Sequence, residues 1–167
     1  MSRIYLIGFM GVGKSTIGKK LARLLGYKFV DTDEIFEEKY KLSIDTFFSK
    51  YNEKLFREFE SNILESTFQL NNTIIATGGG TPCFFDAMDK INNSGISIYL
   101  KMPVDGIVNR LENAIKPRPL VKDKSHEELT LLVEKLLMKR VSSYEKAQII
   151  FEAINPDMDK LLNILKQ

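Results

Sequence analysis

The sequence has very little cysteine or histidine and no strong excess of charge of either sign. Cys83 is the single cysteine among 167 residues, so no disulfide can form within the chain, and this usage is typical of a reducing cytoplasm. His126 is the single histidine, which excludes a metal site built from several histidines. No apolar run approaches the roughly 20 residues that a membrane-spanning helix needs. The 24 basic and 22 acidic side chains leave a net charge of +2, so we expect neither a nucleic-acid nor a membrane partner.

Short apolar segments alternate with segments of helical periodicity along the whole chain, without internal repeats. Strands are expected at Ile4–Ile7, Lys28–Val30, Thr73–Ala76, Ile96–Leu100 and Gln148–Phe151. Helices are expected at Lys14–Leu25, Thr32–Tyr40, Ser43–Tyr51, Glu53–Leu70, Phe84–Asn93, Val104–Asn113 and Glu127–Tyr144, followed by a short terminal helix. This alternation predicts a single α/β domain over residues 1–167, with a parallel sheet covered by helices on both faces.

The clearest motif lies between the first expected strand and the first expected helix. The segment GFMGVGKST fits the spacing G-x-x-x-x-G-K-[ST], with Gly8, Gly13, Lys14 and Ser15 at the defining positions. Its glycines let backbone N–H groups turn toward phosphate oxygens, and the helix directs its positive N-terminus at the same place. Lys14 is expected to reach the β- and γ-phosphates, and Ser15 to offer its hydroxyl to Mg²⁺. The motif predicts a bound nucleoside triphosphate but does not identify the phosphate acceptor.

An acidic cluster, Asp31-Thr32-Asp33, follows the second expected strand. Ligands of open parallel sheets collect at the carboxyl ends of the strands, where two carboxylates can serve a hydrated Mg²⁺ and a substrate hydroxyl. The same residues are also typical of the capped first turn of a helix. Both interpretations remain open from the residues alone.

The segment LFREFE places Arg57 and Glu60 three residues apart, on one face of a helix. Such a pair is usually solvated and contributes little to stability. Alternatively, Glu60 holds the guanidinium so that its planar fork binds a substrate carboxylate.

Three consecutive glycines, Gly78 to Gly80, follow the third expected strand. Such a run is typical of a flexible turn, but it is costly in conformational entropy unless the backbone must approach something closely, so it favours a ligand contact. Two later arginines are further candidates. Arg118 lies in a proline-bounded segment and Arg140 near the end of the long helix. Either one alone is typical of a solubilising surface arginine, but an arginine that closes over a transferring phosphoryl group would stabilise its developing charge.

Together these segments resemble the shikimate kinase family. GFMGVGKST, DTDE, FREFE, TGGG, RPLV and a final Arg-x-x-x-Tyr occur in that family's order, from Gly8 to about Tyr144. The resemblance implies a three-layer α/β/α P-loop kinase fold with a five-stranded parallel sheet in the order 2-3-1-4-5. It also implies ATP-dependent phosphorylation of the 3-hydroxyl of shikimate with Mg²⁺, by a monomer. Mobile substrate-binding helices at about 32–60 and a lid at about 114–127 are part of the same expectation.

The resemblance also implies roles for individual residues. Lys14, Asp33 and Arg118 would be catalytic, while Ser15 and Asp31 would serve the metal, Asp31 through water. ATP would contact Gly11, Val12, Gly13, Lys14, Ser15, Thr16, Arg110 and Arg118, with Arg110 stacked on adenine. Shikimate would contact Asp33, Arg57, Gly79, Gly80 and Arg140, with the two arginines on its carboxylate.

Two other functions remain in view. A kinase for another small hydroxy acid, such as gluconate, would have a different acceptor pattern after the second strand. A regulatory nucleotide-binding module would have lost its acceptor residues, yet Asp33, Arg57 and Arg140 are all present.

Overall fold

The computed structural model describes residues 3–114, 121 and 123–166 of the chain. Its strands pair in parallel to form one five-stranded sheet in the order β2-β3-β1-β4-β5, as predicted. The strands are β1 (Arg3–Ile7), β2 (Lys28–Asp31), β3 (Thr73–Ala76), β4 (Ile96–Lys101) and β5 (Ile149–Glu152). Every predicted strand boundary lies within one residue of the observed one, because these apolar segments end at abrupt changes of composition.

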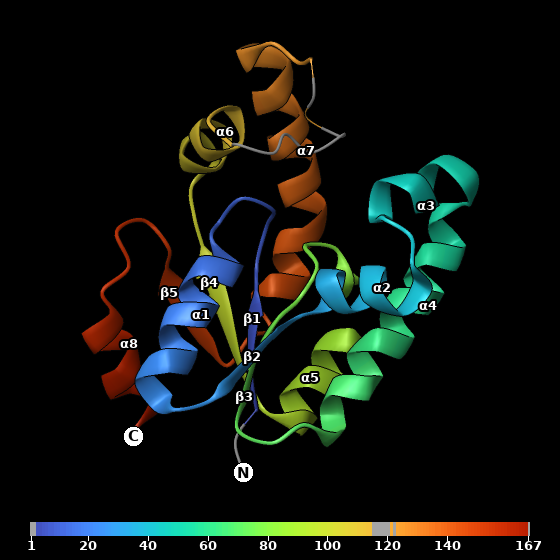
Figure 1. Cartoon of the computed structure of the whole chain (residues 1–167). Helices are drawn as coiled ribbons and strands as arrows, with labels where there is room; N and C mark the ends of the chain where they lie inside the picture. Colours follow the sequence, from blue (N-terminus) through green and yellow to red (C-terminus); the bar gives the residue numbers. More distant parts are fainter. Residues whose placement is uncertain (1–2, 115–120, 122, 167) are drawn as a thin grey trace.

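Helices cover both faces of the sheet. They are α1 (Lys14–Leu25), α2 (Thr32–Tyr40), α3 (Ile44–Lys50), α4 (Glu53–Ser66), α5 (Ala87–Ser94), α6 (Val104–Glu112), α7 (His126–Tyr144) and α8 (Met158–Leu165), with short 3₁₀ helices η1 (Thr67–Gln69) and η2 (Thr81–Cys83). Figure 1 shows α1 and α8 on one face and α4, α5 and α7 on the other, which confirms the three-layer architecture.

Two helix predictions are wrong at one end. The helix expected over Glu53–Leu70 stops being α-helical at Ser66, where η1 takes over the last turn. The helix expected from Phe84 begins only at Ala87, because Phe85 and Asp86 adopt the left-handed conformation with φ of 51° and 54°. Helical periodicity does not reveal such a local backbone reversal.

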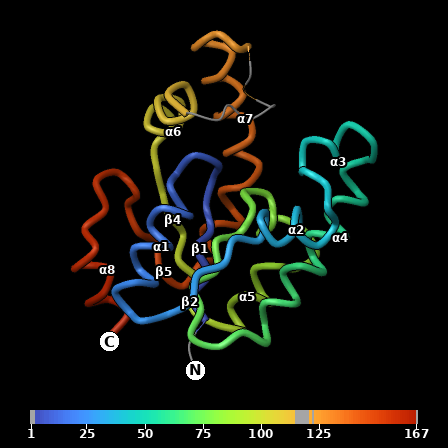
Figure 2. The backbone as a smooth tube through the Cα atoms, viewed as in Figure 1, coloured from blue at the N-terminus to red at the C-terminus, as the bar shows by residue number. Residues whose placement is uncertain are grey.

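The register of the three neighbouring strands β2, β3 and β1 aligns their carboxyl ends. Ala76 pairs with Asp31 on one side and with Leu6 on the other. The segments that follow these strands therefore leave the sheet at one edge. The tube in Figure 2 shows this edge facing away from both chain termini.

The buried apolar residues form two separate clusters. The main cluster lies on both sides of the sheet and includes four of the five residues of β1 and three of the six residues of β4. A smaller one consists of Phe36, Phe47, Phe56 and Ile63, which join α2, α3 and α4 to one another. Helices α2 to α4 thus have an apolar contact region of their own. Within the described part of the chain, no helix is long and apolar enough to cross a membrane.

Helix α1 offers a matched test of the main cluster. Leu21 is fully buried, whereas Leu24 on the same helix is 49% exposed. We expect Leu21→Ala to lower the free energy of unfolding by about 2–5 kcal/mol, since it leaves a cavity under the sheet. Leu24→Ala should change it by less than about 0.5 kcal/mol. Urea unfolding followed by circular dichroism measures both, and equal effects would contradict the assigned packing of α1.

Candidate active site

The loop between β1 and α1 has the backbone shape of an anion cradle. Gly11 and Gly13 adopt positive φ values of 79° and 93°, and Gly13 precedes the first residue of α1. A side chain at Gly13 would also collide with Arg110, since its Cβ would lie 2.9 Å from Nη1. The positive φ therefore favours glycine here, and a side chain would in addition displace the guanidinium of Arg110. Because α1 begins directly after this loop, its positive N-terminal end lies beside it, as in phosphate-binding loops.

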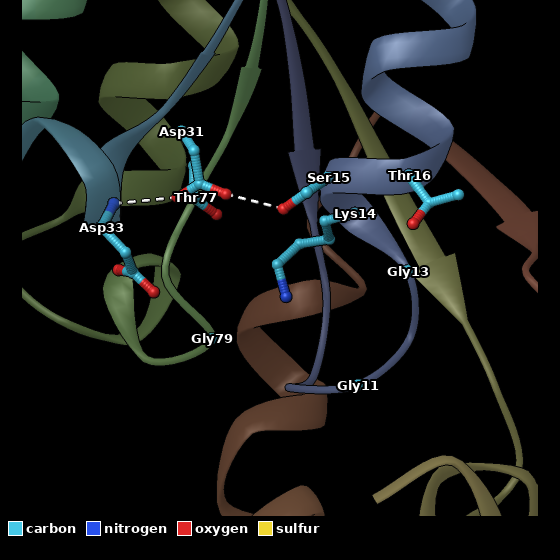
Figure 3. Close-up of a pocket in the computed structure, with 9 residues that line it drawn as sticks. All are labelled: Gly11, Gly13, Lys14, Ser15, Thr16, Asp31, Asp33, Thr77 and Gly79. Carbon is cyan, nitrogen blue, oxygen red and sulfur yellow. Dashed lines mark hydrogen bonds between the residues drawn. The ribbon is translucent and has the colours of Figure 1, made fainter. Parts of the chain in front are cut away.

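Lys14 lies along this loop. Its Nζ donates hydrogen bonds to the carbonyl oxygens of Gly8 and Phe9, both at 2.8 Å. In Figure 3 the ammonium group points into the space between Gly11 and Gly79. A phosphate held by the loop N–H groups would therefore meet this ammonium directly.

Asp31 caps a helix, as one of its two interpretations predicts, and its second oxygen contacts the phosphate loop. Its Oδ1 accepts a hydrogen bond from the backbone N–H of Asp33 at 3.0 Å and so caps α2. Its Oδ2 accepts one from the hydroxyl of Ser15 at 2.7 Å. One carboxylate thus begins a helix and links it to the phosphate loop.

The Ser15–Asp31 pair fits a magnesium ion. A hydroxyl and a carboxylate are hard oxygen ligands, and Mg²⁺ usually takes one or two protein ligands while keeping water and phosphate oxygens. Among the described residues, no group of three or more His, Cys, Asp or Glu side chains could hold a metal by itself. The two oxygen ligands present therefore suit a metal ion that binds together with the phosphates of a nucleotide.

A cavity of about 200 Å³ opens at the aligned strand ends. It brings together the phosphate loop, the acidic cluster and the glycine triplet (Figure 3). Its lining residues are Gly11, Gly13, Lys14, Ser15, Thr16, Asp31, Asp33, Thr77 and Gly79. Donor-side and acceptor-side candidates, distant in sequence, therefore share one space.

Arg57 is buried, so the interpretation of its pair with Glu60 as a solvated surface contact is wrong. The two side chains are 10% and 7% exposed and are joined by a 2.8 Å ion pair. Glu60 also accepts a hydrogen bond from the Thr81 hydroxyl at 2.6 Å. The ring of Phe84 lies against the guanidinium, 4.4 Å from its central carbon. These contacts hold the guanidinium in one orientation.

Each glycine of the triplet has a distinct neighbour. Gly78 donates its N–H to the hydroxyl oxygen of Thr32 at 3.0 Å, and the Gly79 carbonyl accepts the Tyr144 hydroxyl at 2.5 Å. At Gly80 a Cβ would lie 2.5 Å from Nη1 of Arg57. The backbone of the triplet thus lies close to protein groups, at Gly80 to the guanidinium itself, and its contact with a ligand stays a prediction.

The carboxyl-terminal end of α7 completes this side of the site. Arg140 lies over the ring of Phe9, 5.5 Å from its centre, and its Nη1 would be 3.5 Å from a Cβ at Gly79. Tyr144 is fully buried, and burial raises the pKa of its hydroxyl far above the ordinary value. The hydroxyl therefore stays protonated and remains a donor to Gly79 at every physiological pH.

Some predicted residues lie outside the cavity lining. Arg57, Gly80 and Arg140 do not line it: Arg140 lies beside the lining residue Gly79, and Arg57 lies beside the next residue, Gly80. Val12 is buried, and its carbonyl accepts a hydrogen bond from Arg110 at 3.0 Å. Arg118 lies outside the described residues.

Arg110 connects the phosphate loop with the segment that follows β5. Besides the carbonyl of Val12, its guanidinium donates to the carbonyl of Ala153 at 3.3 Å. This arginine therefore lies where the loop around the phosphates meets the carboxyl-terminal part of the chain.

The sequence did not predict the contacts that four polar or aromatic residues make in the site: Thr32, Thr81, Phe84 and Tyr144. The Arg-x-x-x-Tyr spacing places Tyr144 one helical turn after Arg140, which could have indicated a shared role. Nothing in the sequence indicates that Phe84 would lie on Arg57.

The single histidine and the single cysteine of the chain have structural roles. His126 begins α7 and contacts Glu112 at 2.8 Å; this carboxylate raises the pKa of the exposed imidazole. Cys83 is half-buried in η2, and burial raises the pKa of its thiol, which disfavours the reactive thiolate.

The cradle, the serine–aspartate pair and the 2-3-1-4-5 parallel sheet define a P-loop kinase. The family model described as shikimate kinase matches residues 10–165. Shikimate kinase of Parabacteroides distasonis is 42% identical, over 92% of this chain and 88% of its own. The chain belongs to the shikimate kinase family, which confirms the predicted enzyme class and the use of ATP and Mg²⁺.

Solved structures agree with this assignment. Shikimate kinase from Bacteroides thetaiotaomicron has a TM-score of 0.89 and 39% identity, covering 91% of this chain and 86% of that one. The enzyme from Acinetobacter baumannii, in complex with shikimate, has a TM-score of 0.87 and 32% identity, covering 99% and 94%. A gluconokinase from Sinorhizobium meliloti has a TM-score of 0.54 at 15% identity, covering 91% and 82%, and shares only the fold.

Tyr144 and Tyr99 form a matched pair for testing the contact to Gly79. Their rings lie 5.1 Å apart and both are buried, but the Tyr99 hydroxyl makes no hydrogen bond within the described residues. Tyr144→Phe leaves the Gly79 carbonyl without its donor, so we expect a loss of about 1–3 kcal/mol in the free energy of unfolding. Tyr99→Phe should cost less than half of that. Chemical denaturation measures the free energy of unfolding of both variants. Equal losses would show that the hydrogen bond from Tyr144 to Gly79 adds no stability.

Proposed function

We propose that this chain transfers the γ-phosphoryl group of ATP to the 3-hydroxyl of shikimate. The observation that carries the proposal is the common cavity, lined by Lys14 of the phosphate loop and by Asp33 of the acidic cluster. The phosphate of the donor and the hydroxyl of the acceptor would be held next to each other in this cavity. Proximity of this kind supplies a large part of the catalysis in phosphoryl transfer.

The nucleotide would be held by the loop residues Gly11, Val12, Gly13, Lys14, Ser15 and Thr16. Lys14 would leave the carbonyls of Gly8 and Phe9 and bind the β- and γ-phosphates. Arg110 would lie beside the adenine, since it already joins the phosphate loop to Ala153. When bound, Mg²⁺ would neutralise phosphate charge; Ser15 would face it directly and Asp31 through water.

Shikimate would bind through its carboxylate to Arg57 and Arg140 and through its ring to the backbone of Gly79 and Gly80. Two arginines beside one glycine loop are the cationic partners that a small anionic acid needs. Asp33 would accept the proton of the 3-hydroxyl as its oxygen attacks the γ-phosphorus. The bond to the leaving oxygen then breaks, which gives shikimate 3-phosphate and ADP.

Closure of the site belongs to the same proposal. Residues 32–60 would move as a unit, which their separate cluster of Phe36, Phe47, Phe56 and Ile63 supports. A lid at about 114–127, with Arg118 on the phosphates, remains a prediction of the family resemblance. A monomeric state is another prediction of that resemblance, whereas a cytoplasmic location and the lack of a nucleic-acid or membrane partner remain predictions from the composition.

A coupled ADP-release assay with shikimate, quinate and gluconate as acceptors tests the function. We expect turnover that depends on shikimate and little with gluconate. ATP binding without any shikimate-dependent turnover would instead identify a regulatory module, and turnover with gluconate alone would identify another hydroxy-acid kinase.

The proposed proton acceptor has a matched control. Asp33→Asn should lower kcat at least about 100-fold, because the amide cannot accept the hydroxyl proton. Asp45→Asn, an exposed aspartate in the first turn of α3, should leave kcat unchanged. Steady-state kinetics with calorimetric ATP titration measures both variants. Loss of ATP affinity in Asp33→Asn would place this carboxylate at the donor end and refute its acceptor role.

A further inference from the structure

Arg57 contacts two carboxylates of its own helix, one on each side of its guanidinium. Nη1 donates to Glu60 at 2.8 Å. The opposite edge, formed by Nε and Nη2, donates to Oε1 of Glu53 at 3.3 and 3.1 Å. One positive charge is thus surrounded by two negative charges, and the group of three carries a net charge of −1 when all are ionised.

The two carboxylates differ in burial and in their other contacts. Glu60 is buried and is also held by the Thr81 hydroxyl at 2.6 Å. Glu53 has a side chain that is 63% exposed, and within the described residues its side chain contacts only Arg57 through hydrogen bonds. Glu60 therefore suffices to neutralise and orient the buried guanidinium.

Glu53 is also not needed to start its helix. The N-cap of α4 is Asn52, whose side-chain oxygen accepts the Leu55 N–H at 2.9 Å. An acidic residue in the first turn adds only a small favourable interaction with the helix dipole. The edge of Arg57 that Glu53 occupies is the Nε–Nη2 edge, one of the edges through which arginine binds carboxylates with two hydrogen bonds.

We propose that Glu53 weakens binding of the acid substrate by competing with the substrate carboxylate for Arg57. The inference rests on the proposed function, in which the shikimate carboxylate binds this guanidinium. An incoming carboxylate must displace Glu53 or approach a cation whose charge is already offset twice. Because Glu53 is exposed, its displaced carboxylate returns to water at little cost. Glu53 thereby sets how much anionic substrate is needed to fill the site.

The test is Glu53→Gln, which keeps the side-chain length and an accepting oxygen but removes the charge. We expect the KM and the calorimetric Kd for shikimate to fall about two- to fivefold, the range expected for a partly exposed charge interaction. The kcat and the KM for ATP should stay unchanged. At about 0.5 M salt the difference from the unmodified enzyme should shrink, since salt screens exposed charges.

Glu58→Gln is the matched control. Glu58 is exposed on the same helix and has no ion pair among the described residues, so its variant makes the same change in net charge without touching Arg57. It should leave shikimate affinity within about 1.5-fold, because an exposed distant charge is largely screened. If both variants bound shikimate more tightly by the same factor, the change in net charge alone would explain the effect, and the inference would be overturned.

A second comparison separates this inference from the proposed function. Arg57→Ala should weaken shikimate binding strongly, and Glu53→Gln should then have no effect in its background. If Arg57→Ala does not weaken shikimate binding, the proposed carboxylate contact itself is wrong. If it does, but Glu53→Gln alone leaves affinity unchanged or weaker, Glu53 holds Arg57 in place and only the competition is refuted.

Discussion

The alignment of the carboxyl ends of β2, β3 and β1 is the constraint on which the site depends. Parallel pairing places Asp31, Ala76 and Leu6 in one row across the sheet. Everything that follows these residues must then turn at the same edge. The phosphate loop, the acidic cluster and the glycine triplet meet there although they lie tens of residues apart. A shift in this register would separate the groups that hold the phosphate from those proposed to hold its acceptor.

Around that edge, several side chains of the site are held in place by a hydrogen bond to a residue of another segment. Asp31, at the start of α2, accepts a hydrogen bond from Ser15, and Tyr144 of α7 donates one to Gly79. Glu60 pairs with Arg57 and accepts a hydrogen bond from Thr81. The partners are buried or partly buried, so each contact is shielded from competition with water. Glu53 differs because it is mostly exposed, which leaves its contact open to exchange.

Much of the fold was predictable because its signals are local. The strands are short apolar runs that end where the composition changes abruptly, and α1 begins at Lys14, directly after a glycine. Errors occurred where the backbone departs from its periodicity, as at Phe85 and Asp86. For the site, three of the motif segments meet at one cavity, and the comparisons agree with the family to which the motifs pointed.

By itself, the sequence determined the nucleotide cradle, the order of strands and helices, and the family, since each is encoded by residue type and spacing along one stretch of chain. Only the tertiary structure decided between the open interpretations of single residues. Asp31 proved to be both a cap and the partner of Ser15, and Arg57 proved to be buried. The reason is physical: burial and the choice of a hydrogen-bond partner depend on segments brought together across the sheet, and neighbouring positions in the chain do not encode them.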